Sequence, residues 1–212
     1  MGAAQTAWHP EAGLIWYDAV QWENGNLYTL SGGEDLSLGS GTHAIAVNSA
    51  AIVVGAGGRS IDPNGSFHAY LWEGGKLTDM NTLVPDGSPW FLREAVGVNT
   101  RRQIIGNGVA TGLSGAFIWE EGIITDIGSP FPGGRSDSRG INAAGAVVGR
   151  TTDGAVWRAF VWRDSWIADL NELIPSGSGW ILEVAISISD TGFIVGTGKH
   201  NGVNSAFILT PQ

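Results

Sequence analysis

The chain lacks cysteine altogether, which excludes disulfides, thiolate zinc sites and a cysteine nucleophile. Charge is also scarce, because charged residues make up only 15% of the chain, against roughly 25% in an average soluble domain. The 11 basic and 20 acidic residues leave a net charge of −9 and form no basic cluster, so we expect no nucleic-acid partner. No apolar run reaches the roughly 18 residues of a membrane-spanning helix, and we expect no membrane span. Residues 1–10 lack a basic region followed by an apolar core, so we expect no signal peptide in this chain.

Glycine and tryptophan are abundant, at 33 and 10 of the 212 residues, and 43% of the chain is apolar. This apolar content is that of a folded protein with a substantial core. Many glycines together with many aromatic residues are typical of short strands joined by tight turns. We therefore expect an all-β protein with a single domain over residues 1–212.

One unit recurs along the chain. Its centre is an apolar strand that ends in Asn or Ser, followed by a short turn and a second apolar strand that ends in Gly seven residues later. The four copies cover residues 48–55, 99–106, 142–149 and 189–196, and their glycines lie 51, 43 and 47 residues apart. A repeat of this length with short strands is the size of one propeller blade.

Each copy continues with a third apolar strand, and the first three copies with a fourth. The third strands end at Trp72, Trp119, Trp162 and Leu209, and we expect the three tryptophans to be buried between neighbouring sheets. A partial unit precedes the four copies. The units are centred on residues 44–80, 93–127, 138–170 and 184–209, and the partial unit covers residues 1–30.

This pattern predicts a β-propeller of about five blades built from four-stranded repeats of 43–51 residues. An open β-solenoid is the alternative, but it would expose apolar end faces unless they were capped. No polar cap is evident at either end of the sequence, so we expect the units to close into a ring.

The repeated asparagines and glycines predict the turns within each unit. We expect Asn48, Asn99 and Asn142 to accept hydrogen bonds from their own turn backbone. Gly145 and Gly192 suit a left-handed turn residue, whereas residues 51 and 102 are Ala and Arg. We expect those two turns to be strained or differently shaped.

The third strand of the first complete unit is His68-Ala69-Tyr70-Leu71-Trp72, and it is followed by Gly-x-Leu-x-Asp. Together with the Val-Val-Gly strand, it resembles the bacterial extracellular repeat family named for its His-Ala-Phe (HAF) motif. The other units carry Gly115, Arg158 or Ser205 in place of His68. The resemblance covers residues 18–207 and implies repeats and a location outside the cytoplasm, but no chemistry.

Acidic residues recur once per unit at the end of the fourth strand, and they are weak candidates for calcium ligands. A structural role in fixing the following loop is the favoured interpretation. The segment Asp62 to Gly65 has the start of a calcium loop, but it is also an ordinary turn sequence, which we favour. The recurring acidic residues are Asp79, Asp126 and Asp169.

Two loops between units match closely, at residues 83–92 and 173–182, and we expect the loops between units to gather on one face around a central channel, where ligands would bind. The candidate ligand-binding residues are Trp90, Arg93, Arg135, Arg139 and Trp180. Packing between units is the favoured role of the two tryptophans.

No nucleophile elbow, phosphate loop or HExxH motif is present in the sequence. We therefore expect an exported binding module that presents one face to a glycan or another small ligand. A purely structural repeat without a site is a third possibility. The alternative, drawn from fold analogy alone, is a metal (calcium)-dependent hydrolase of a small ester, lactone or glycoside. Its candidate catalytic residues are His43, Glu94, Asp137 and Glu183.

Overall fold

The computed structural model of the protein describes residues 2–9, 14–23, 26–30, 42–58 and 67–211. These residues form five antiparallel sheets that follow one another in chain order. The first sheet comprises β1 (Gly2–His9), β2 (Leu14–Glu23) and β3 (Asn26–Thr29). The second comprises β4 (Thr42–Val47), β5 (Val53–Gly58), β6 (Phe67–Glu73) and β7 (Lys76–Asp79).

The third sheet comprises β8 (Trp90–Val98), β9 (Ile104–Ala110), β10 (Leu113–Glu120) and β11 (Ile123–Asp126). The fourth comprises β12 (Arg135–Ile141), β13 (Val147–Thr152), β14 (Trp157–Arg163) and β15 (Trp166–Asp169). The fifth comprises β16 (Trp180–Ile188), β17 (Ile194–His200) and β18 (Val203–Leu209). Two 3-10 helices, η2 (Met80–Leu83) and η3 (Leu170–Glu172), follow β7 and β15.

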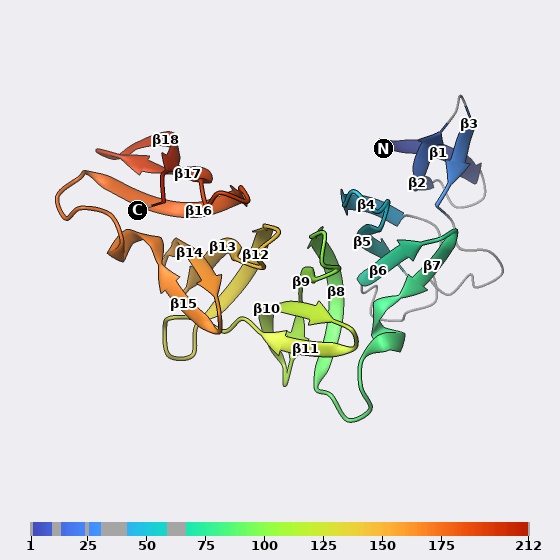
Figure 1. The fold of residues 1–212 in the computed structure, drawn as a ribbon, viewed down its shortest axis with the longest axis horizontal. Helices are drawn as coiled ribbons and strands as arrows, with labels where there is room; N and C mark the ends of the chain where they lie inside the picture. Colours follow the sequence, from blue (N-terminus) through green and yellow to red (C-terminus); the bar gives the residue numbers. More distant parts are fainter. Residues whose placement is uncertain (1, 10–13, 24–25, 31–41, 59–66, 212) are drawn as a thin grey trace.

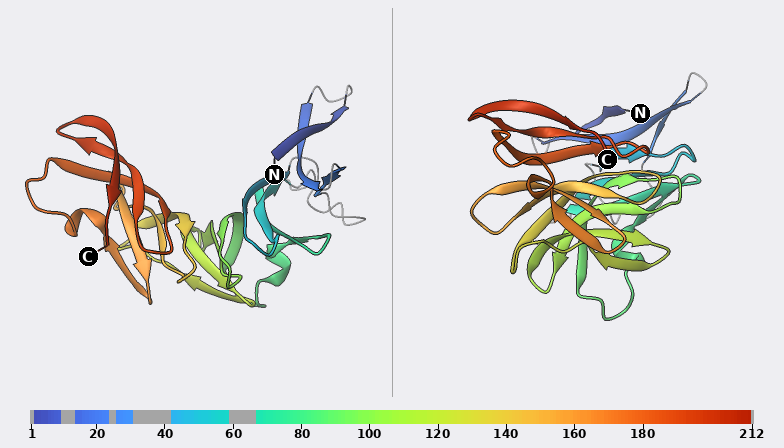
Figure 2. Two further views of the ribbon diagram at one scale, coloured as in Figure 1. Left: turned by 45° about the horizontal axis from the view of Figure 1, so that its top comes forward. Right: turned by 60° about the vertical axis from the view of Figure 1, so that its left-hand side comes forward.

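The predicted all-β repeat fold with propeller-like sheets is confirmed. Figure 1 shows the sheets stacked along an arc, with the first and fifth sheets at its two ends, and the left view of Figure 2 shows the same separation. The described sheets therefore form an open arc in place of the expected closed ring. No helix in the described part of the chain is long and apolar enough to cross a membrane.

The same irregularity marks the first strand of the second to fifth sheets. One extra residue interrupts its pairing with the second strand, which is a β-bulge and bends the strand. The bulges lie between Ala44 and Ala46, Ala95 and Gly97, Ser138 and Gly140, and Ala185 and Ser187. The third and fifth sheets carry a second bulge in the same strand, between Leu92 and Glu94 and between Leu182 and Val184, so the four units share one bulge and differ at the other.

The repeated glycine is the third residue of the second strand, which continues beyond it and does not end there as the sequence predicted. The glycine has a packing reason. A Cβ atom added to Gly149 would lie 2.0 Å from the carbonyl oxygen of Asp137 and 2.9 Å from the ring of Phe160. Gly55, Gly106 and Gly196 face an equivalent carbonyl and the ring of Tyr70, Phe117 and Phe207. The aromatic ring of the third strand therefore lies over a backbone that has no side chain.

Apolar side chains fill the space between consecutive sheets. Val54, Leu71 and Met80 of the second sheet and its helix η2 pack with Leu92 and Trp119 of the third sheet. Equivalent residues join the third sheet to the fourth and the fourth to the fifth. Trp119 and Trp162 are buried, as the sequence predicts, whereas Trp72 is only half-buried. The third strands of the second, third and fourth sheets are covered on both faces because each of these sheets has two neighbours.

The turn asparagines have a second role that the sequence did not reveal. As expected, the side-chain oxygen of Asn48 accepts hydrogen bonds from the backbone of Ala50 and Ile52. That of Asn99 accepts two equivalent bonds in its turn, and that of Asn142 accepts one, from Ala146. Each side-chain amide also donates to the turn of the next sheet. The bonds run from Asn48 to the Asn99 carbonyl (2.9 Å), from Asn99 to the Asn142 carbonyl (3.1 Å) and from Asn142 to the Ser189 carbonyl (3.1 Å).

Of the two outcomes expected for the turns that lack glycine, a strained turn or a different shape, the structure shows the first, because both turns keep the left-handed residue. Ala51 has φ 59° and Arg102 has φ 67°, against φ 86° at Gly145 and 88° at Gly192. A side chain in this region costs about 1–2 kcal/mol per residue. The first two turns therefore keep the shape of the others at some cost in stability.

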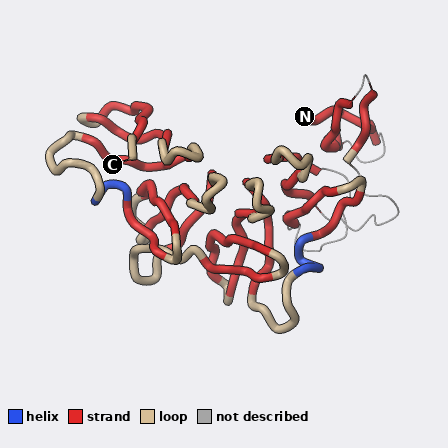
Figure 3. Tube along the Cα trace, viewed as in Figure 1, coloured by secondary structure: helices blue, strands red, loops and turns tan. Residues whose placement is uncertain are grey.

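The long loops between sheets lie elsewhere than expected. Figures 1 and 3 place the loops that precede β8 and β16 on the outer side of the arc. The prediction that they surround a central channel is wrong. The reason is the direction of the first strand, which starts at the outer side and ends at the asparagine turn on the inner side.

Candidate functional site

The site is formed by the first strands, which are edge strands of their sheets and lie next to each other along the stack. One position of this strand carries His43, Glu94, Asp137 and Val184 in successive sheets, as the register of each strand pair shows. It is therefore polar in three consecutive sheets, where the repeat itself demands no polar side chain.

A cleft of about 660 Å³ opens along this row of first strands. It brings together three of the four candidate catalytic residues, His43, Glu94 and Asp137, and one candidate ligand-binding residue, Arg93. We call it the first-strand cleft. Its other lining residues are Ile45, Ala56, Phe67, Asn107, Gly108, Ser114 and Gly115.

Glu94, which lines the cleft, is held by its cross-strand partner. The side-chain amide of Asn107 donates to the Glu94 carboxylate at 2.8 Å. The side-chain oxygen of Asn107 accepts from the backbone of Ser138 in the next sheet, also at 2.8 Å. Asn107 thus fixes the carboxylate of one sheet against the first strand of the next.

Asp137 is held by arginine. Nε of Arg150, its cross-strand partner, donates to Oδ2 of Asp137 at 2.8 Å, and the terminal NH2 nitrogen of Arg150 lies 2.7 Å from the same oxygen. The guanidinium of Arg150 stacks over the ring of Trp157, with 3.9 Å between its Cζ and the ring centroid. This stacking restricts the arginine, so the position of the carboxylate is set by two neighbouring strands.

The remaining candidate residues do not join the first-strand cleft. Glu183 lies in β16, where its Oε1 is 3.3 Å from Nζ of Lys199. Arg135 lies over the ring of Trp157 at 5.3 Å from the centroid, and Arg139 approaches Asp137 at 4.0 Å.

The two loop tryptophans take the packing role that the sequence favoured. Trp90 packs against the core between the second and third sheets and meets the ring of Phe117 edge-on. Trp180 packs against the core between the fourth and fifth sheets and stacks on His200, with the ring centroids 4.7 Å apart.

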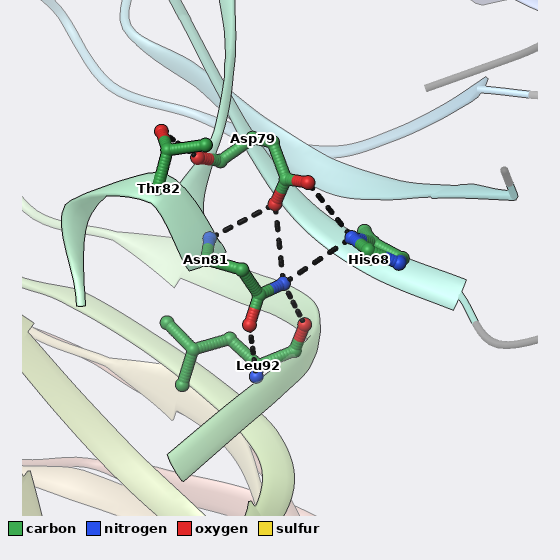
Figure 4. A network of polar contacts seen from close by, with 5 residues as sticks. All are labelled: His68, Asp79, Asn81, Thr82 and Leu92. Carbon is green, nitrogen blue, oxygen red and sulfur yellow. Dashed lines mark hydrogen bonds and ion pairs between the residues drawn. The ribbon is translucent and has the colours of Figure 1, made fainter. Parts of the chain in front are cut away.

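The recurring acidic residues fix loops. Oδ1 of Asp79 accepts from the backbone and side chain of Asn81 and so caps η2, while Oδ2 contacts Nδ1 of His68 at 2.8 Å. Figure 4 shows how Asn81 then bonds both backbone groups of Leu92, the start of the next sheet.

Asp169 repeats this arrangement in η3 through Asn171 and Leu182, with Arg158 in the place of His68. Asp126 accepts from the backbone of Gly128. Within the described residues, no group of three or more His, Asp or Glu side chains converges as metal ligands would. The segment Asp62 to Gly65 lies outside the described residues.

Sequence reasoning missed several residues of the site, among them Asn107, Phe67, Arg150 and Ser114. Asn107 and Arg150 lie on the second strands of their sheets, directly opposite Glu94 and Asp137. The residue at the same position of the second sheet is Ala56, opposite His43. Aligning the repeats position by position would have shown that Asn107 and Arg150 stand where the first complete unit has only the small residue Ala56.

No family model matches the chain, and no curated protein matches it either. The resemblance to the HAF repeat family, and the location outside the cytoplasm that it implies, therefore remain predictions.

Proposed function

We propose that the protein is a binding module that takes a neutral carbohydrate in the first-strand cleft. The observation that carries the proposal is the set of planar polar groups contributed by consecutive sheets, Glu94, Asn107 and Asp137, each fixed by its neighbours. Such preorganised groups lose little freedom when they bind a ligand.

The chemistry of the lining suits hydroxyl groups. Carboxylate and amide oxygens accept hydrogen bonds from sugar hydroxyls, and Arg93 and the amide of Asn107 can donate to them. Phe67, which is 51% exposed, supplies an apolar ring at the same cleft. The net charge of −9 disfavours an anionic ligand.

A hydrolase is the second candidate, because two carboxylates and His43 line one cleft. Both carboxylates are already engaged, Glu94 by an amide and Asp137 by Arg150. A glycosidase needs one carboxyl to give a proton and another to act on the sugar or on water. The engaged state of both groups favours binding over turnover.

The test is calorimetric titration of the 212-residue chain with a panel of neutral oligosaccharides. Phe67→Ala and Glu94→Gln should each weaken the best binder about tenfold or more, which corresponds to about 1.4 kcal/mol. Glu94→Gln keeps an oxygen for Asn107, so its fold should be unchanged.

The matched controls are Val203→Ala and Glu172→Gln, which change exposed residues away from the cleft lining. They should bind like the unaltered protein. Absence of binding to any neutral oligosaccharide, or full affinity in both cleft variants, would overturn the proposal. Release of reducing sugar that Glu94→Gln abolishes would assign the hydrolase function instead.

A further inference from the structure

The two ends of the stack expose sheet faces of the kind that the interior buries. Each sheet has a forward face, which packs on the next sheet, and a backward face, which packs on the previous one. The forward face of the fifth sheet and the backward face of the first have no neighbouring sheet in Figure 1. Exposed apolar faces of this kind mark interaction sites.

The forward face of the fifth sheet carries a cross-strand pair, Val195 and Ile208. These residues are 42% and 64% exposed. The residues at the same register in the preceding sheets are all at most 9% exposed, and each contributes to the contact with the next sheet. They are Val54 and Leu71, Ile105 and Ile118, and Val148 and Val161.

The backward face of the first sheet carries Trp22, which is 68% exposed. Its cross-strand partner is Leu27, and the register matches that of Trp72 with Leu77, Trp119 with Ile124 and Trp162 with Ile167. Those three tryptophans pack against the previous sheet. Trp22 thus lies at the position that contacts the previous sheet in the other units, but no previous sheet covers it.

The structure assigns these two faces to each other: we propose that the fifth sheet of one copy of the chain packs on the first sheet of a second copy, head to tail. The repeat indicates that the partner of each exposed face is the opposite face of a second copy. Each contact between described sheets joins a forward face to a backward face, and none joins two faces of the same kind. Association of different patches is heterologous and lengthens into larger assemblies unless it closes.

The experiment is sedimentation velocity of the 212-residue chain over a wide range of concentration. The unaltered protein should form dimers and larger species as concentration rises. Ile208→Asp and Trp22→Asp each remove one face and should each sediment as a monomer. Because both side chains are exposed, neither change should alter the circular dichroism spectrum.

The mixture of these two variants separates the proposal from its rivals. Each variant retains the face that the other has lost, so an equimolar mixture should form a dimer and stop there. Leu113→Asp, a change at an exposed residue outside both faces, should associate like the unaltered protein. A monomeric unaltered protein, self-association of either variant alone, or a mixture that stays monomeric would overturn the proposal.

Discussion

Tyr70 carries a hydroxyl that the fold does not use. Its side chain is fully buried, and the hydroxyl has no hydrogen-bond partner among the described residues. The equivalent residues of the next three sheets are Phe117, Phe160 and Phe207. A buried polar group without a partner costs stability, so we expect Tyr70→Phe to raise the free energy of unfolding by about 1 kcal/mol. Urea denaturation measures this change, and Tyr28→Phe, at an exposed position, should leave stability unchanged.

Burial also raises the pKa of the Tyr70 hydroxyl well above its ordinary value. The unfolded chain releases this proton near pH 10, whereas the folded protein keeps it. Stability is therefore fully present below pH 10 and falls as the pH rises above it, because ionisation favours the unfolded state. Tyr70→Phe should escape this loss, so its advantage should grow between pH 9 and about 11. A constant difference across this range would contradict the assignment.

At the scale of the elements, the asparagine ladder ties the turns of consecutive sheets. Asn142→Asp keeps an oxygen for the backbone of Ala146 but replaces the donor to the Ser189 carbonyl with a second oxygen. We expect this variant to lose about 1–3 kcal/mol of unfolding free energy. Ser189→Asp changes the same repeat position in the exposed last turn and should cost much less. Equal losses would show that the ladder adds nothing to the stack.

The strand glycines offer a second test of the repeat. Gly149→Ala would place a methyl group against a backbone carbonyl and the ring of Phe160, and we expect a loss of about 1–3 kcal/mol. Gly115→Ala is the control, because the nearest atom to its added Cβ is the tip of Trp90 at 3.4 Å. Thermal denaturation of both variants should separate them clearly, and a tolerated Gly149→Ala would contradict the packing described.

These element-scale features are those that the sequence predicted best. The strands, the turns and the repeated glycines depend on residues close together in the sequence, and the same pattern occurs in four copies. A prediction made for one copy is therefore strengthened by the other three. For the turns at Ala51 and Arg102, the same rules predicted either strain or a different shape, and the structure shows the strained left-handed residue. Asn107 and Phe67 could not, because their role depends on which strands of different sheets lie side by side, and the pattern within one unit does not contain that information.

At the scale of the whole molecule, the sequence predicted the stacking but not the shape of the stack. Whether five sheets close depends on the angle between neighbouring sheets. That angle depends on the volumes of the side chains packed in each interface. These volumes differ slightly from one interface to the next; for example, one repeated position holds Met80, Ile127 and Leu170. Small errors in the angle add up over four interfaces, so the open arc and the outer position of the long loops become evident only in three dimensions.

The central claim is that the row of first strands, and no other surface, is where the ligand binds. Amide chemical-shift mapping of the 15N-labelled protein with the tightest-binding neutral oligosaccharide tests it most directly. We predict that the largest changes cluster at residues 43, 45, 93–94, 107–108, 114–115 and 137, which line the first-strand cleft. Changes centred on the outer loops at residues 83–92 and 173–182, with the cleft unaffected, would contradict the claim.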